Sequence, residues 1–268
     1  MKFLSLSSGV LLAFQLNTFA QTDATKATVK KQFYFMWGYH RDMYSASDID
    51  FKDLTTNNYD FTLRHAIAND KPDWDNFFTT PLTVPQYSFS VGYFKNEKWG
   101  YELSWDHLKY VVNDNQILHL VGQIEGKYHD TDTLVTPSFV HFQHTNGNNY
   151  AMVSALRRIN LFKSEDGRQR LSLLVRAGAG ALVPKTYSTV LGQDNSHRFH
   201  LAGFVVGTGV ALRYDFFHYF FIEQSAKGAF ADYTSAVLKD DGRATHTFFS
   251  VEYLLSLGIN IPRGKIKF

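Results

Sequence analysis

The chain has 268 residues, with 27 lysines and arginines against 25 acidic residues and no cysteine. A formal net charge of +2 gives no basic field for a nucleic-acid partner, and the lack of cysteine excludes disulfides and thiolate metal sites. The length corresponds to about one domain.

The N-terminus predicts export. Lys2 is followed by a mostly apolar stretch that ends at Ala20, which is the charge and hydropathy order of a secretory signal peptide. We therefore expect a signal peptide at residues 1–20, a polar periplasmic lead at 21–31 and one folded domain at 32–268. No later stretch has the roughly 18 consecutive apolar residues that a membrane-spanning helix needs.

Eight segments alternate apolar and polar residues with the period of two that a β-strand requires. In the last segment Val251, Tyr253 and Leu255 form an apolar row, while Ser250 and Glu252 lie in the other row. A membrane barrel turns the apolar row to lipid and the polar row to its lumen. The segments lie at 32–42, 87–94, 99–110, 150–162, 169–187, 198–214, 217–233 and 245–260.

The connections alternate strictly between short turns and long loops, as expected when one end of an up-and-down barrel faces the periplasm and the other faces out. We therefore predict an all-β fold: a closed antiparallel up-and-down transmembrane β-barrel of about eight strands, with two long extracellular insertions at 43–86 and 111–149. The short turns lie near Asn96, Asp166 and Asp215, and the other long connections cover 188–197 and 234–244.

Weaker strand signals lie inside both insertions. In the first, 59–66 can form a hairpin with 49–53. In the second, 117–124 and 138–144 are candidate strands that either form a hairpin projecting beyond the membrane or add an extra pair to the wall, which would raise the count to ten or twelve. Arg157 falls on the lipid face, where an arginine costs roughly 2–4 kcal/mol at mid-bilayer, so we expect a bulge or an interfacial position there.

The inward rows carry charges of both signs within the strands. The interior of an eight-stranded barrel is just wide enough for side chains, and unpaired charges there would be costly. We therefore expect a network of ion pairs that plugs the lumen; the alternative is a narrow pore for ions or small solutes. The predicted network consists of Glu102, Asp106, Arg158, Arg170, Arg176, Arg213, Glu223, Lys227 and Glu252.

The signal peptide, the eight alternating strands, the alternation of short turns and long loops and the charged lumen resemble those of the small Gram-negative outer-membrane β-barrels of the OmpA/OmpX type. The aromatic, asparagine-rich strands and the hairpin Gly-Tyr-Phe-Lys-Asn-Glu-Lys-Trp-Gly at 92–100 most resemble those of uncharacterised outer-membrane barrels of the Bacteroidota. It covers most of residues 30–261 and is one of pattern rather than of a diagnostic motif. It implies a barrel in the cell outer membrane, and it implies little about activity.

One segment offers an enzymatic alternative. Residues 141–147 resemble the His-x-Ser-Asn-x-Gly stretch of the lipid A deacylase barrels, which would make His144 and Thr145 the catalytic pair of an outer-membrane hydrolase. Adjacent residues of a strand point to opposite faces, however, whereas a nucleophile and its base need hydrogen-bond contact. We therefore favour a protein without a catalytic site.

No metal site and no cofactor are predicted. Ten of the eleven histidines, all except His218, map to the outer end or its loops, and we interpret them as ordinary loop polarity because no pair has a ligand spacing. The predicted role is structural or interactive, through the large extracellular loops. The expected partners are outer-membrane lipid, lipopolysaccharide and an extracellular or outer-membrane protein, with no nucleic acid.

Overall fold

The structure is a computed structural model of the chain. The expected signal peptide at 1–20 and the lead at 21–31, apart from Lys31, lie outside the described residues and stay predictions. No helix in the described part is long and apolar enough to cross a membrane. The described residues are 31–72, 86–196, 198–217 and 219–262.

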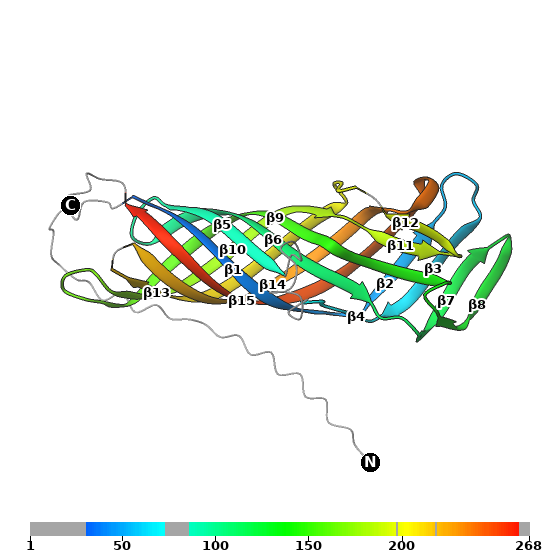
Figure 1. The fold of residues 1–268 in the computed structure, drawn as a ribbon, viewed down its shortest axis with the longest axis horizontal. Coiled ribbons are helices and arrows are strands. Elements are labelled where there is room, and N and C mark those ends of the chain that lie inside the picture. The colour runs from blue at the N-terminus through cyan, green and yellow to red at the C-terminus, as the bar shows by residue number, and fades with distance from the viewer. Residues whose placement is uncertain (1–30, 73–85, 197, 218, 263–268) are drawn as a thin grey trace, which may run out of the picture.

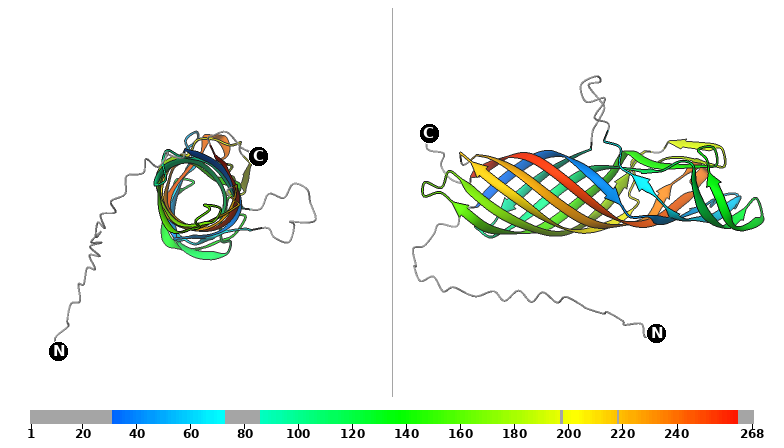
Figure 2. Two further views of the ribbon diagram at one scale, coloured as in Figure 1. Left: turned by 90° about the vertical axis from the view of Figure 1, so that its left-hand side faces the viewer. Right: turned by 90° about the horizontal axis from the view of Figure 1, so that it is seen from below.

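Eight strands of the described chain form a closed antiparallel ring, which confirms the predicted barrel (Figures 1 and 2). The ring closes where the first strand pairs with the last, in a register that runs from Gln32 opposite Pro262 to Tyr44 opposite Ser250. The strands of the ring are β1 (Gln32–Tyr44), β5 (Tyr87–Phe94), β6 (Trp99–Val112), β9 (Val140–Lys163), β10 (Arg170–Pro184), β13 (Gly203–Phe216), β14 (Phe220–Val237) and β15 (Arg243–Pro262).

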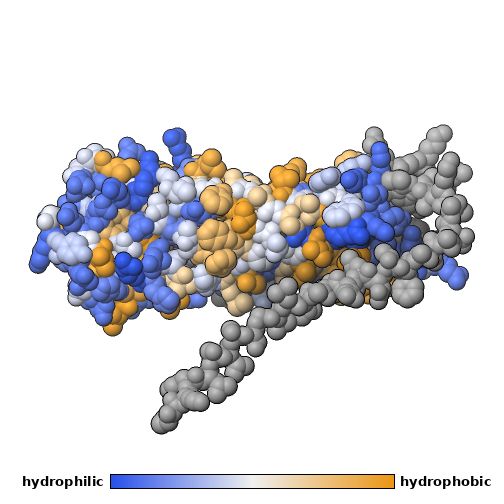
Figure 3. Space-filling view, turned by 180° about the vertical axis from the view of Figure 1, so that it is seen from behind, coloured by the Kyte–Doolittle hydropathy of each residue, from blue (hydrophilic) through white to orange (hydrophobic). Residues whose placement is uncertain are grey.

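The two faces of the wall differ as the alternation predicts. Large apolar side chains cover the middle of the outer surface, while the end that carries β7 and β8 is mostly hydrophilic (Figure 3). Leu255 is 57% exposed, whereas its neighbours Leu254 and Ser256 turn inward. A closed ring with an apolar exterior satisfies every wall hydrogen bond without water, so the protein is a transmembrane barrel of the outer membrane.

Arg157 occupies a position that lipid tolerates. Its guanidinium carbon lies 4.7 Å from the ring centroid of Trp99, the first residue of β6 after the short turn at 95–98. This places Arg157 near the periplasmic interface, where an arginine costs little. The β9–β10 register also shifts between Leu171 and Ser172, so the expected bulge lies close by.

The wall continues beyond the bilayer at the outer end. A transmembrane strand needs roughly 9–11 residues, whereas β9 has 24 residues and β15 has 20. Counted from the periplasmic turns, residues 140–149 of β9 and 243–248 of β15 lie outside the membrane. We call this region, with the strands that the insertions add to it, the outer extension.

The insertions extend the sheet instead of widening the ring. From β15 the sheet runs through β2, β3 and β7 to β8, while β11 pairs with β9 and β12 (Figure 1). β4 and the 3-10 helix η2 complete the connections. The added elements are β2 (Ser47–Lys52), β3 (Tyr59–Ala66), β4 (Ala68–Asn69), β7 (Gln116–Ile124), β8 (Lys127–Val135), β11 (Tyr187–Val190), β12 (Gln193–Ser196) and η2 (Lys239–Asp241).

One predicted pairing is confirmed and another is wrong. β2 and β3 form the expected hairpin. β7, however, pairs with β8 and not with 138–144, because Glu125 and Gly126 adopt positive φ angles of 51° and 74° and make a two-residue turn directly after β7. Residues 140–144 are instead the start of β9.

Two apolar clusters fill the ends of the lumen. The inner core, near the periplasmic turns, consists of Tyr34, Met36, Phe94, Leu156, Leu174, Ala211 and Phe221. The outer core is larger and lies mostly within the outer extension, where Phe51 of β2 packs edge-on against Phe142 and stacks on Phe61 of β3. Most of the charged lumen side chains lie between the two cores.

Candidate functional site in the barrel lumen

Four charged side chains meet above the inner core, and we call Glu102, Arg176, Arg213 and Glu223 the inner cluster. Arg176 Nη2 lies 2.5 Å from Glu223 Oε1, and its Nε lies 3.1 Å from Glu102 Oε1. Arg213, directly opposite Glu223 in the β13–β14 register, donates from Nε to Glu223 Oε2 at 2.6 Å. The cluster is buried and neutral, with two charges of each sign.

The inner cluster depends on a glycine. Tyr34, Gly92 and Glu102 are opposite one another on the adjacent strands β1, β5 and β6. A Cβ at Gly92 would lie 2.0 Å from the Tyr34 ring, so only glycine lets this ring cross β5 and donate its hydroxyl hydrogen to Glu102. The guanidinium of Arg213 stacks between two rings, 4.2 Å from Tyr34 and 3.9 Å from Phe221.

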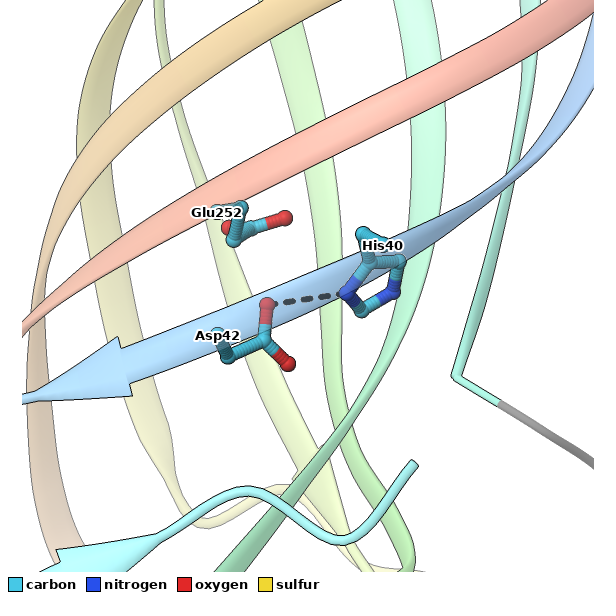
Figure 4. A group of neighbouring side chains, drawn as sticks. All are labelled: His40, Asp42 and Glu252. Carbon is cyan, nitrogen blue, oxygen red and sulfur yellow. Dashed lines mark hydrogen bonds and ion pairs between the residues drawn. The ribbon is translucent and has the colours of Figure 1, made fainter. Parts of the chain in front are cut away.

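A second group, the outer cluster, lies nearer the outer extension and consists of Asp106, Lys227, Glu252, His40 and Asp42. Lys227 Nζ contacts Asp106 Oδ2 at 2.5 Å and Glu252 Oε1 at 2.9 Å. Asp42 is opposite Glu252 in the β1–β15 register, and its Oδ1 lies 2.8 Å from His40 Nδ1 (Figure 4). The cluster therefore joins carboxylates from three strands around one lysine.

His40 and Asp42 were not predicted as site residues. The interpretation of the histidines as ordinary loop polarity is wrong for His40, which is 2% exposed and faces the lumen. The alternation of the strand places His40 in the inward row with Tyr34 and Met36. The sequence alone does not show that closure of the ring brings this row beside Glu252.

A small cavity lies between the two clusters. It has a volume of about 30 Å³, and its lining includes the hydroxyls of Ser88, Ser90 and Ser104 as well as Arg176 and Lys227. A cavity of this size with several polar partners has room for one or two water molecules.

The remaining predicted lumen residues lie at the periplasmic end. Arg170 Nε contacts Asp215 Oδ2 at 2.9 Å. Arg158 has no carboxylate partner within the described residues; its guanidinium carbon lies 3.5 Å from the Phe94 ring centroid, and it donates to Gln32 Oε1. The structure thus brings eight of the nine predicted residues into ion pairs and places Arg158 against an aromatic ring.

Three further histidines contradict the loop interpretation. His107 is buried in β6, and its Nδ1 lies 2.7 Å from Asn149 Oδ1. His144 and His246 are buried in the outer core, and Tyr233 stacks on both, with ring centroids 4.8 Å and 4.7 Å away. His144 Nδ1 hydrogen-bonds to Thr186 at 3.1 Å, and neither ring nitrogen of His246 has a hydrogen-bond partner in the described chain. Burial lowers the pKa of His144 well below its usual range and lowers the pKa of His246 to about 3.

The geometry around His144 does not form a catalytic pair. Thr145 follows it on the same strand and is partly exposed on the opposite face, and the hydroxyl at His144 is that of Thr186. Base and nucleophile must be within hydrogen-bond contact, so His144 and Thr145 are not placed to act as a pair.

No protein-family model matches the chain, and no curated protein matches it. Several solved outer-membrane barrels are similar in structure. Ail, the attachment invasion locus protein of Yersinia pestis, is 14% identical with a TM-score of 0.35, over 87% of this chain and 99% of Ail.

Two proteins of Pseudomonas aeruginosa give similar values. The N-terminal β-barrel domain of OprF is 15% identical with a TM-score of 0.33, over 86% of this chain and 97% of that domain. The outer membrane protein OprG is 9% identical with a TM-score of 0.35, over 87% of this chain and 96% of OprG. At these values the similarity carries no functional argument.

The inner cluster predicts a large loss of stability on Glu223→Gln, because this change leaves two buried arginines short of one charge. Breaking a buried ion pair costs about 3–5 kcal/mol. Glu97→Gln is the control, since Glu97 pairs with Lys163 at 3.6 Å on the surface, where an ion pair contributes about 1 kcal/mol or less. Urea unfolding in lipid vesicles measures the free energy of unfolding of both variants. Equal losses in the two variants would contradict the buried ion-pair network.

The buried His246 predicts acid sensitivity of the outer extension. An unfolded histidine has a pKa of about 6.5, whereas that of His246 is lowered to about 3. Between these values the unfolded chain binds a proton that the folded chain excludes. The free energy of unfolding is therefore highest above about pH 6.5. As the pH falls below this value, it decreases by about 1.4 kcal/mol per pH unit.

His246→Phe keeps an aromatic ring and removes the titration, so unfolding free energies measured from pH 7 to pH 4 should fall less steeply. The control is His119→Phe in β7, where a hydrogen bond to Asp132 raises the pKa of the histidine. A histidine with a raised pKa stabilises the fold as the pH falls, so replacing His119 cannot flatten the slope. An unchanged slope in His246→Phe would exclude this histidine as the cause.

Proposed function

We propose that the protein is an integral outer-membrane barrel with a plugged lumen, and that it acts through the outer extension as a structural or interaction protein. The observation that supports the proposal is the packing of the lumen. Members of both ionic clusters line a cavity of about 30 Å³, and the outer core lies beyond them. A lumen packed in this way leaves little room for a continuous water column.

The outer extension suits a role in contact with other molecules because it is built as a rigid body. Its strands continue the hydrogen-bonded wall, and its interior holds a core of aromatic and aliphatic side chains. On its surface Ile117 of β7 lies opposite Leu134 of β8, and the two side chains are 73% and 53% exposed. Such a pair favours a protein partner at this hairpin.

The proposed partners follow from the position of each surface. The apolar wall contacts outer-membrane lipid, including the acyl chains of lipopolysaccharide in the outer leaflet, and the outer extension contacts an extracellular or outer-membrane protein. We also propose that residues 1–20 direct export and that the hairpin at 92–100 relates the chain to barrels of the Bacteroidota.

The enzymatic and pore alternatives have less support. A hydrolase acting on lipid A would need His144 accessible beside a nucleophile, yet this side chain is buried and Thr145 faces away from it. A pore would need the ion pairs of Arg176 and Lys227 to separate, at a cost of several kcal/mol for each buried charge.

The proposal predicts the absence of channels. The purified barrel, reconstituted in a planar bilayer at neutral pH, should give no discrete conductance steps, while an open porin added to the same bilayer confirms that steps are detectable. Reproducible unit steps from the barrel alone would reject the plugged lumen and support the narrow pore.

A further inference from the structure

We propose that His40, Asp42 and Glu252 bind one divalent transition-metal cation in the outer half of the lumen. One potential ligand atom from each side chain lies within 4.8 Å of the other two, and all three side chains are buried. Figure 4 shows the side chains of β1 and β15 converging on one point inside the wall.

The hydrogen bonds around the three residues orient them as metal ligands. His40 Nε2 lies 3.2 Å from the backbone carbonyl oxygen of Tyr87, an acceptor that requires the hydrogen to be on Nε2. Nδ1 is then the free ligand atom. A metal-bound histidine commonly donates its other ring hydrogen to a carbonyl in this way. Asp42 is held similarly, since Gln86 Nε2 donates to its Oδ2 at 2.6 Å.

A positive charge is needed between His40 and Asp42. With its hydrogen on Nε2, neutral His40 directs the Nδ1 lone pair at Asp42 Oδ1, and the two atoms are only 2.8 Å apart. Two lone pairs at this distance repel each other unless a cation lies at or beside them. That cation is either a proton, which makes His40 an imidazolium, or a metal ion.

The charge balance favours the metal ion. The outer cluster holds three buried carboxylates, Asp42, Asp106 and Glu252, against one lysine, Lys227, so it lacks two positive charges. A proton on His40 supplies one, and one of the carboxylates would have to bind a second proton for the cluster to be neutral. A divalent cation supplies both and makes the cluster neutral, which removes the cost of an uncompensated charge in a low-dielectric interior.

The donor set indicates the class of metal. One imidazole nitrogen and two carboxylates suit Zn²⁺, Mn²⁺, Fe²⁺ or Co²⁺, whereas Ca²⁺ takes six to eight oxygens and Mg²⁺ keeps most of its water. Because the three side chains are buried, the cation is expected to be taken up as the barrel folds, and its binding then contributes to the free energy of folding.

The test is refolding of the full barrel into detergent with Co²⁺, followed by removal of free metal. Folded wild-type protein should retain about one Co²⁺ per chain and show the visible absorption bands of a nitrogen- and oxygen-ligated ion. His40→Gln and Glu252→Gln should each retain less than about a tenth of that amount. Refolding with Zn²⁺ or Mn²⁺ and elemental analysis gives the same comparison for the other metals.

The control variant is His107→Gln. His107 is also a buried histidine, on β6, but its Nδ1 contacts Asn149 at 2.7 Å and it lies outside the three-residue site, so this variant should bind as wild type does. Metal is counted only in the folded fraction, which the altered electrophoretic mobility of an unheated barrel reports. Folded wild type that retains none of the three metals would overturn the proposal, and so would His40→Gln binding at the wild-type level.

Discussion

The hydrogen-bonded contact between β1 and β15 is the constraint on which the rest of the structure depends. It joins the first and last strands of the wall over 13 residue pairs, and it leaves the wall without an exposed sheet edge in the bilayer. Once the ring is closed, each wall side chain faces either outward or into the lumen. The odd positions of β15 from 249 onward face lipid, and the even positions, including Glu252, are enclosed.

Closure explains why the interior is built from neutral groups of charges. A charge that points into a lumen of this width finds either a partner or an aromatic ring, as the inner cluster and Arg158 do. The outer cluster differs because its carboxylates outnumber its one lysine, and this excess points to a bound cation. With the outer core above both clusters, the outer extension forms the surface of the protein on that side of the membrane.

Much of this arrangement follows from local patterns. The period-two rows of β6, β13 and β15 place Glu102, Arg213 and Glu252 inside, and the lengths of the turns give the orientation of the barrel. The rows do not show which inward charges meet, since that depends on ring closure and register. His40 was missed for this reason, although its row was assigned correctly.

The outer extension was less predictable because its strands are short and depend on turn geometry. The turn at Glu125 and Gly126 is visible only through backbone angles, and an aspartate–glycine or asparagine–glycine pair would have been a clearer signal. The start of β9 contains polar residues such as Asn146 and Asn148 that break the alternation. His144 and His246 are polar residues in an aromatic core, which residue type alone does not predict.

The central claim is that one row of each strand faces acyl chains while the other faces a closed, charge-paired lumen. Since the chain has no cysteine, single cysteines along positions 249–257 of β15 can carry spin labels, whose collisions with oxygen and with a water-soluble nickel chelate are measured in lipid vesicles. The structure predicts strong oxygen contact at 251, 253, 255 and 257, and protection from both reagents at 252, 254 and 256. Access of the nickel chelate to the even positions, or no alternation along the strand, would contradict it.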